Sequence, residues 1–296
     1  MAHVSNLIDV NELQSQMHDS DLRIIDCRFE LADPDAGRRA YLLAHIPGAV
    51  FADLDQDLAA PISPQSGRHP LPDVDRFAAT LGRLGISNSS SVVVYDAGNG
   101  SLAARAWWLL RWLGHKRVRL LDGGFDHWLA SAGPVVSGDE QVSEAQFQPE
   151  PHKNMVLTTA ELESDIDAIP GMRLYDARDA ARFRGEIEPI DPVAGHVPGS
   201  LNLPFPVSLN ENGRWKSEDA LRDLWRAVLG EDRQAPWAVM CGSGVTACHL
   251  AISAMEAGYR EPRLYVGSWS EWIRDPERPI GLGDGSNPGS GPADLA

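Results

Sequence analysis

The sequence predicts an α/β protein that contains the same kind of domain twice, each domain being a mostly parallel sheet with helices on both faces. Three observations lead to this prediction. Short apolar segments alternate with amphipathic ones, the motifs of the first half recur in the second, and 296 residues suffice for two ordinary domains. We expect helices at 74–84, 102–113 and 220–229, where apolar residues recur at helical spacing.

The internal repeat sets the expected domain organisation. Four pairs of segments match in the same order, with only small insertions between them. The matched pairs are 22–28 with 172–178, 44–51 with 195–202, 91–110 with 237–254, and 120–128 with 264–272.

Residues 133–154, between the copies, are polar and contain three prolines and no periodicity, which is typical of a linker. The end of the chain is rich in Gly, Ser and Pro, which indicates disorder. We therefore expect an N-terminal domain at 1–134, a linker at 135–154, a C-terminal domain at 155–280 and a disordered tail at 281–296.

Residues 236–258 combine a short apolar strand, a glycine-bearing loop and an apolar helix, and Cys241 stands where the strand ends. Gly242 and Gly244 have no Cβ, so the loop backbone can curl with its N–H groups pointing inward. The N-terminus of the following helix adds the positive end of its dipole. An anion suits such a loop, and the nucleophilic thiolate of Cys241 is the first candidate.

A cysteine at a strand end can also be a small buried apolar residue, which is the commoner case for cysteines in general. The two glycines, together with Ser243 and Thr246, favour the reactive interpretation here, although Thr246 could equally cap the helix. Cys248 and His249 do not have the spacing of zinc ligands, and we treat both as structural. No metal or organic cofactor is expected.

The composition limits partners and compartment. With 26 basic and 42 acidic residues the formal net charge is -16, which disfavours nucleic acid and anionic membranes as partners. Three cysteines do not make a disulfide framework. The N-terminal residues lack the features of a signal peptide, and no apolar run reaches membrane-spanning length. We expect a soluble cytoplasmic protein that attracts any anionic substrate locally.

The two copies differ where chemistry is expected. Asp96 in the N-terminal copy is aligned with Cys241, and a carboxylate cannot act as a sulfur nucleophile. We therefore expect only the C-terminal copy to be active. The N-terminal copy is expected to close one side of the active-site cleft, since ligand sites favour domain interfaces.

Four motifs in the C-terminal half point to a known family: D-A-R with R-F-R-G at 176–185, G-H-V-P-G at 195–199, C-G-S-G-V-T-A at 241–247 and G-S-W-S-E-W at 267–272. With the first copy, they resemble the tandem-domain sulfurtransferases of the rhodanese superfamily over nearly the whole chain. The resemblance implies two rhodanese-like domains and transfer of sulfane sulfur. It further implies that a donor gives sulfur to the Cys241 thiolate, and that cyanide, a small thiol or thioredoxin removes it from the persulfide.

In this interpretation the loop binds the donor and stabilises the persulfide anion. The N–H groups from Gly242 to Thr246, including those of Gly244 and Val245, can aim at one point. The hydroxyls of Ser243 and Thr246 can add further hydrogen bonds.

The resemblance also bears on the donor. The branch that acts on thiosulfate typically has two cationic side chains in the loop, whereas this chain has Gly242 and Ser243, as in the 3-mercaptopyruvate branch. The first of that branch's two substrate-binding arginines corresponds to Arg182, but the second position holds Asp191. The resemblance implies 3-mercaptopyruvate as the donor, with thiosulfate as the alternative.

Arg182 is expected to bind the donor's carboxylate, because a guanidinium offers a planar two-point contact. An ion pair with Asp176 or Glu186 is the alternative role. Arg184 is a further candidate for the missing second arginine, although Arg is also common on surfaces.

His45, in the N-terminal copy, resembles a residue proposed in the mercaptopyruvate branch to assist proton transfer with the loop serine. Both His45 and His196 could instead fix the backbone of a turn, and for His196 we prefer this structural role.

Two other functions remain as alternatives. A cysteine phosphatase also holds an anion in an amide-lined loop, but needs an Arg six positions after the cysteine, where this chain has Ala247. A non-catalytic sulfur carrier would form the persulfide without turnover.

Overall fold

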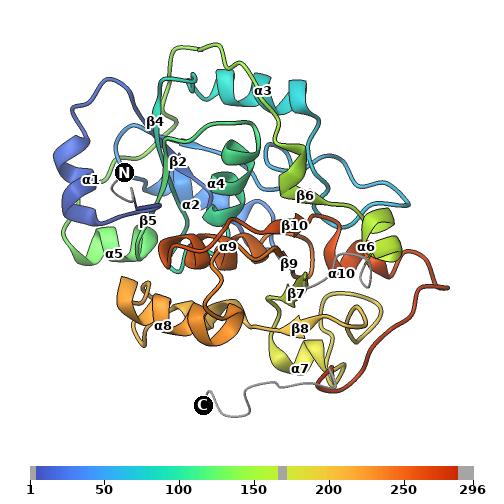
Figure 1. Ribbon diagram of the computed structural model, residues 1–296. Helices are drawn as coiled ribbons and strands as arrows, with labels where there is room; N and C mark the ends of the chain where they lie inside the picture. Colours follow the sequence, from blue (N-terminus) through green and yellow to red (C-terminus); the bar gives the residue numbers. More distant parts are fainter. Residues whose placement is uncertain (1–4, 166–171, 286–296) are drawn as a thin grey trace. The chain divides into compact units, whose positions relative to one another are not determined.

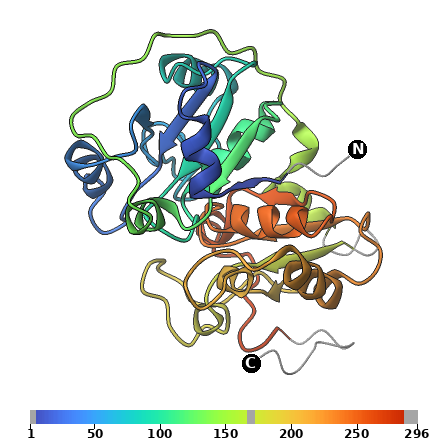
Figure 2. The same ribbon diagram turned by 90° about the vertical axis from the view of Figure 1, so that its left-hand side faces the viewer.

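The computed structural model describes residues 5–165 and 172–285, which form two compact units. Each unit contains a five-stranded sheet in which all neighbouring strands run parallel, with the connecting helices beside it (Figures 1 and 2). The expected α/β class and the duplication are thereby confirmed.

The first unit has the strand order β1-β5-β4-β2-β3, so β4 lies at the centre of its sheet. Its strands are β1 (Leu7–Ile8), β2 (Leu22–Asp26), β3 (Ala49–Phe51), β4 (Ser91–Tyr95) and β5 (Val118–Leu121). Its helices are α1 (Val10–Gln16), α2 (Ala36–Leu43), α3 (Val74–Arg83), α4 (Ala103–Trp112) and α5 (Gly124–Ala130).

The second unit repeats this order as β6-β10-β9-β7-β8, with β9 at the centre. Its strands are β6 (Val156–Leu157), β7 (Arg173–Asp176), β8 (Leu201–Asn202), β9 (Trp237–Met240) and β10 (Arg263–Tyr265). Its helices are α6 (Thr159–Asp165), α7 (Ala180–Phe183), α8 (Glu218–Leu229), α9 (Ala247–Glu256) and α10 (Ser268–Trp272). Two short 3-10 helices are formed by Lys153–Met155 and Phe205–Ser208.

The three helices expected from apolar periodicity are α3, α4 and α8, within one or two residues of their expected bounds. Their ends follow ordinary capping chemistry. The Asp73 side chain accepts hydrogen bonds from two N–H groups at the start of α3, and Ser217 accepts one at the start of α8. Gly230 follows α8 with a φ of 87°, a conformation that favours glycine.

The cores contain the residues that the alternating pattern places in strands. Every residue of β9 is buried, as expected for a central parallel strand covered on both faces. Trp128 in the first unit and Trp269 in the second are both fully buried in these cores. These tryptophans therefore pack the interior of their own units.

The duplication extends to individual side-chain contacts. The guanidinium of Arg28 pairs with Asp26 at 2.6 Å, and that of Arg178 pairs with Asp176 at 2.7 Å. Each arginine also donates to a backbone carbonyl 16 or 17 residues further along the chain. The D-x-R motif thus does the same structural work after β2 and after β7.

The units differ from the expected domain limits in three places. The second unit includes Ile62–Arg68, although this segment lies in the first half of the sequence, and the first unit includes Leu209–Trp215. Residues 135–153, expected to be mostly linker, belong to the first unit. There the N–H groups of Ala145 and Glu150 donate to the carbonyls of Gly82 and Leu113, at 2.9 and 3.0 Å.

The first residues of the expected disordered tail are held by backbone hydrogen bonds. Gly281 forms an antiparallel bridge with His196, and the N–H of Gly283 donates to the carbonyl of Arg184 at 3.0 Å. Backbone pairing therefore holds these glycines in place, and the remainder of the expected tail, 286–296, lies outside the described residues. Within the described ranges, no helix has the length and apolarity needed to cross a membrane.

Candidate active site

Cys241 lies directly after β9, at the carboxyl end of the central strand of the second sheet, and α9 begins six residues later. In open parallel sheets this edge is where ligands bind. The side chain is buried, with 2% of its surface exposed. The strand, loop and helix are those that the sequence predicts.

The turn at 268–270 holds the loop in place. The N–H of Trp269 donates to the carbonyl of Cys241 at 3.1 Å, and that of Ser270 donates to the carbonyl of Gly242 at 2.8 Å. The hydroxyl of Ser268 accepts from the N–H of Cys241 at 3.1 Å. The carbonyls of Cys241 and Gly242 are thus bound by N–H groups of α10.

Gly244 is required by this path. Its φ is 75°, and a Cβ added there would lie 2.6 Å from the carbonyl oxygen of Val266. Gly242 has no such strain, but a Cβ there would point at the guanidinium of Arg68, 3.1 Å from Nη2. The two glycines therefore serve different purposes: one allows the turn, and the other allows a cation to approach the backbone.

The loop has N–H groups to offer to an anion. Within the part of the chain that the structure describes, the N–H groups of Gly242, Val245 and Thr246 donate to no other group. Thr246 occupies the N-cap position of α9, yet its side chain makes no capping hydrogen bond, so the capping role considered above is wrong. Ser243 is buried within the loop.

The first unit shows what such a loop binds. After β4, the carboxylate of Asp96 accepts hydrogen bonds from the N–H groups of Gly98, Gly100 and Leu102 at 2.9–3.0 Å, and from Ala103 at 3.2 Å. Burial raises the pKa of Asp96, while these hydrogen bonds act to lower it. The first loop thus binds its own side-chain carboxyl group.

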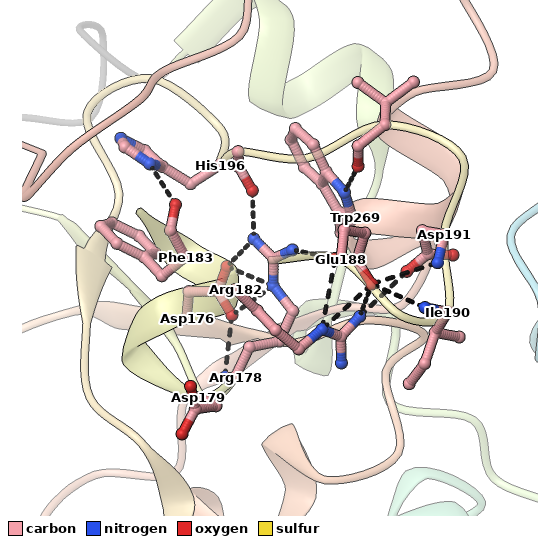
Figure 3. A network of polar contacts seen from close by, with 12 residues as sticks. Asp176, Arg178, Asp179, Arg182, Phe183, Glu188, Ile190, Asp191, His196 and Trp269 are labelled. Carbon is pink, nitrogen blue, oxygen red and sulfur yellow. Dashed lines mark hydrogen bonds and ion pairs between the residues drawn. The ribbon is translucent and has the colours of Figure 1, made fainter. Parts of the chain in front are cut away.

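Arg182 lies at the end of α7 in a network of buried charges (Figure 3). Its Nε and Nη2 donate to the carboxylate of Glu188 at 2.7–3.2 Å, and Nη2 also lies 3.2 Å from Asp191. The alternative prediction that Arg182 pairs with Asp176 or Glu186 is wrong, because Asp176 pairs with Arg178 and Glu186 pairs with Arg184. Nη1 of Arg182 donates to none of the described residues.

Glu188 connects the arginines of this network. Its carboxylate also lies 3.5 Å from Arg178, and it accepts from the N–H groups of Ile190 and Asp191 at 3.1 Å. Burial alone would raise the pKa of Glu188, but the hydrogen bonds from Arg182 and from these N–H groups hold the pKa below its usual value. Glu188 is therefore an anion that orients Arg182.

Arg68 also reaches this site. Its guanidinium pairs through Nη1 with Asp191, whose other oxygen faces Arg182, so that one carboxylate lies between two arginines. Gly242 is close to both, because the nearest nitrogen of Arg182 is 3.7 Å from the position of an added Cβ. Arg184, by contrast, is engaged with Glu186 at 2.7 Å and both side chains are partly exposed.

His45 and His196 make the same contact in their respective units. Each ring stacks on an aromatic side chain, Tyr41 or Phe183, and its Nδ1 lies 2.8 Å from the carbonyl oxygen of that residue. Each histidine thus fixes a turn, as expected for His196. Among the described contacts of His45, none involves Ser243, and its role in proton transfer stays a prediction.

Sequence reasoning missed four polar residues of this site: Arg68, Glu188, Ser268 and Ser270. The two serines belong to the G-S-W-S-E-W motif, where the tryptophans draw attention and the serines bind the loop. Glu188 lies only six residues after Arg182, and this short separation of opposite charges could have predicted their ion pair. Nothing local in the sequence connects Arg68 with the loop.

Comparison with known proteins gives two matches to the rhodanese-like domain, over residues 9–131 and 158–275. The chain is 45% identical over 282 residues to the probable 3-mercaptopyruvate sulfurtransferase of Pseudomonas aeruginosa, covering 95% of this chain and 99% of that protein. It is 39% identical over 283 residues to the putative thiosulfate sulfurtransferase SseB of Mycobacterium tuberculosis, covering 94% and 97%.

Among solved structures, SseA from Escherichia coli, described as a 3-mercaptopyruvate sulfotransferase, matches with a TM-score of 0.79. The two chains are 32% identical, and the match covers 90% of this chain and all of that one.

Proposed function

Because this chain belongs to the family of rhodanese-like domain proteins and is a sulfurtransferase, we propose that its donor is 3-mercaptopyruvate and that the sulfur is carried on Cys241. The sulfur acceptor is a thiol, such as a small thiol or thioredoxin, or cyanide. The reaction takes place in the cytoplasm, with neither nucleic acid nor membrane as a partner.

The observation that supports this proposal is the contrast between the two loops. Asp96 fills the first loop with its own carboxylate, which accepts four backbone hydrogen bonds. In the second loop a cysteine stands at the equivalent position, and the N–H groups of Gly242, Val245 and Thr246 donate to no described group. A persulfide anion on Cys241 would carry a negative charge at this loop and could accept hydrogen bonds from these N–H groups.

The chemistry balances without an external oxidant. The Cys241 thiolate attacks the sulfur of the donor, an S–S bond forms, and the C–S bond of mercaptopyruvate breaks. The leaving carbon departs as the enolate of pyruvate and takes up a proton. Cyanide or a thiolate then attacks the outer sulfur, and the electron pair of the S–S bond returns to Cys241.

The residues of the loop and its surroundings divide this work. Gly244 and Gly242 shape the loop, Ser243 follows the nucleophile by two residues, and Thr246 is the residue before α9. Arg182 binds the carboxylate of the donor through its available Nη1, while Glu188 holds the other edge of the guanidinium. His45 keeps its proposed part in proton transfer.

The test of the nucleophile is Cys241→Ser, because an alcohol does not form a persulfide. Turnover should be lost with every donor. Mass spectrometry of the wild type after exposure to mercaptopyruvate should show one added sulfur on the peptide that contains Cys241. Cys27→Ala, which replaces a buried cysteine of the first unit, is the control and should retain activity. A Cys241→Ser variant with a tenth of wild-type turnover would overturn the proposal.

Thiosulfate is the second candidate donor, because relatives with that name are also similar to this chain. The uncharged Gly242 and Ser243 favour the monocarboxylate over the dianion. Steady-state kinetics with both donors at equal ionic strength should give the higher kcat/KM for mercaptopyruvate. A phosphatase lacks support, since Ala247 stands at the position of the required arginine.

A further inference from the structure

Arg68 reaches the active site on a segment that belongs, by sequence, to the other half of the chain. We call residues 62–68 the strap; they lie in the second unit. The N–H of Arg68 donates to the hydroxyl of Ser270 at 2.9 Å, and Nε of Arg274 donates to the carbonyl of Ser66 at 2.9 Å. The strap is therefore bound to α10 and the residues after it.

The strap and the catalytic loop are held by the same residue. Ser270 accepts from the N–H of Arg68 with its side chain and donates its own N–H to the carbonyl of Gly242. At Gly67 the approach is so close that an added Cβ would lie 2.6 Å from the carbonyl oxygen of Gly267 and 2.9 Å from the Ser270 hydroxyl. This packing fixes where the Arg68 side chain begins.

The guanidinium of Arg68 has donors that the protein does not use. Nη1 pairs with Asp191, but Nε is buried and has no hydrogen-bond partner in the described structure. Nη2 lies 3.1 Å from the position that a Cβ of residue 242 would occupy. Buried donors in proteins are nearly always satisfied, so unused ones beside a reactive loop indicate a ligand.

We infer that Arg68 is a donor-binding residue, and that it supplies with Arg182 the pair of guanidinium groups that grips a carboxylate next to Cys241. The geometry supports this pair, because both guanidinium groups approach Gly242 and both contact Asp191. This inference rests on the proposed function only in assuming an anionic carboxylate donor.

This pairing also gives Asp191 a role. Asp191 has Arg182 on one side, and Arg68 brings the second guanidinium to its other side. Asp191 then holds the two cations at a separation suited to sharing an anion. The ligand class is a small monocarboxylate that carries a transferable sulfur.

The direct experiment compares two alkylating reagents that differ in one charge. Iodoacetate carries a carboxylate and iodoacetamide does not, and both alkylate Cys241. In Arg68→Ala the ratio of the iodoacetate rate to the iodoacetamide rate should fall roughly 10-fold or more, the usual scale for a lost charge-assisted hydrogen bond. The iodoacetamide rate itself should stay within about two-fold of wild type.

Steady-state kinetics give the second readout. In Arg68→Ala the kcat/KM for mercaptopyruvate should fall roughly 10- to 150-fold, mainly through KM, because Arg68 contacts the donor and not the transferred sulfur. Arg68→Gln keeps a side chain of similar length and serves if the alanine variant does not fold. Arg222→Ala is the matched control, since Arg222 is an exposed ion-paired arginine of the same unit on α8.

Two results would overturn the inference. An unchanged rate ratio in Arg68→Ala would show that no carboxylate is held there. An equal slowing of both reagents would show that Arg68 supports the loop structurally. A changed ratio in a protein that does not turn over mercaptopyruvate would keep Arg68 as a carboxylate-binding residue while refuting the proposed donor, so the two proposals fail separately.

Discussion

At the scale of single residues, Asp191 places a negative charge between two arginines beside the loop that carries Cys241. One of its oxygens contacts Arg68 and the other lies 3.2 Å from Arg182, so its carboxylate occupies both guanidinium groups. It also lies 3.8 Å from the position of a Cβ at Gly242, close to where a donor must enter. Asp191 therefore orders the arginines and at the same time repels a negatively charged donor.

Asp191→Asn should raise the kcat/KM for thiosulfate more than that for mercaptopyruvate, because the dianion gains more from the loss of a negative charge. Two unit charges about 8 Å apart interact with roughly 2 kcal/mol at an effective dielectric constant near 20, so a gain of about ten-fold or more is expected for thiosulfate. Glu186→Gln, an exposed carboxylate of the same unit, is the control. Equal losses with both donors would instead assign Asp191 to positioning alone.

Arg182→Lys keeps the charge and loses the planar fork. Since Nε and Nη2 of Arg182 are already bound to Glu188, a lysine can serve either Glu188 or the donor but not both. The kcat/KM for mercaptopyruvate should fall roughly 10- to 150-fold, with little change in the alkylation of Cys241 by iodoacetamide. Parallel loss of alkylation would show that Arg182 supports the loop and not the donor.

At the scale of elements, the site depends on backbone contacts between β9, the loop, and the turn that begins α10. These contacts join residues that are 27 or 28 positions apart. Because the carbonyls of Cys241 and Gly242 point toward α10, the N–H groups of the same peptide units point away from it. Gly244 is the point at which this arrangement tolerates no side chain. The loop is thus a rigid part of the unit.

Gly244→Ala should abolish activity and lower the melting temperature. Strain from a positive φ costs on the order of 1–3 kcal/mol, and the contact with the carbonyl of Val266 adds to it. Gly213→Ala is a matched control, because Gly213 has a φ of 71° but nothing within 4 Å of an added Cβ. A melting temperature equally lowered in both variants would mean that the Val266 contact is relieved by a small shift.

At the scale of the whole molecule, buried ion pairs tie the stability of the second unit to pH. The pKa of Glu188 lies below its usual value of 4.5. A carboxyl whose pKa is lower in the folded state stabilises that state above its unfolded pKa, and this contribution is lost as the pH falls through the folded value. Loss of stability from this source therefore begins only below about pH 4.5.

Glu188→Gln should lower the melting temperature at pH 7 and make it less dependent on pH below about 4.5. Replacing Glu188 removes the closest anion of Arg182 and leaves that buried guanidinium with Asp191 alone, which is costly. Glu186→Gln is the control, since exposed ion pairs contribute little. Calorimetry across this pH range checks the prediction, and parallel pH profiles for wild type and Glu188→Gln would contradict it.

The alternation of apolar segments and the internal repeat were enough to predict two α/β domains, because strand and helix periodicity are local properties of a sequence. The same holds for the strand, loop and helix around Cys241 and for the substitution by Asp96. The strand and helix signals lie within about twenty consecutive residues, where backbone geometry determines which side chains face the same way, and the repeat aligns these local patterns with one another.

The tertiary structure alone decided which residues surround the loop. Arg68 and Asp191 are 123 positions apart, and the strap joins the second unit only because the chain returns to it from the first half of the sequence. Glu188, not Asp176 or Glu186, pairs with Arg182 because the buried Asp176 is already bound by Arg178. Periodicity carries no information on such contacts, since they depend on the path of the chain through space and on which partners are already engaged.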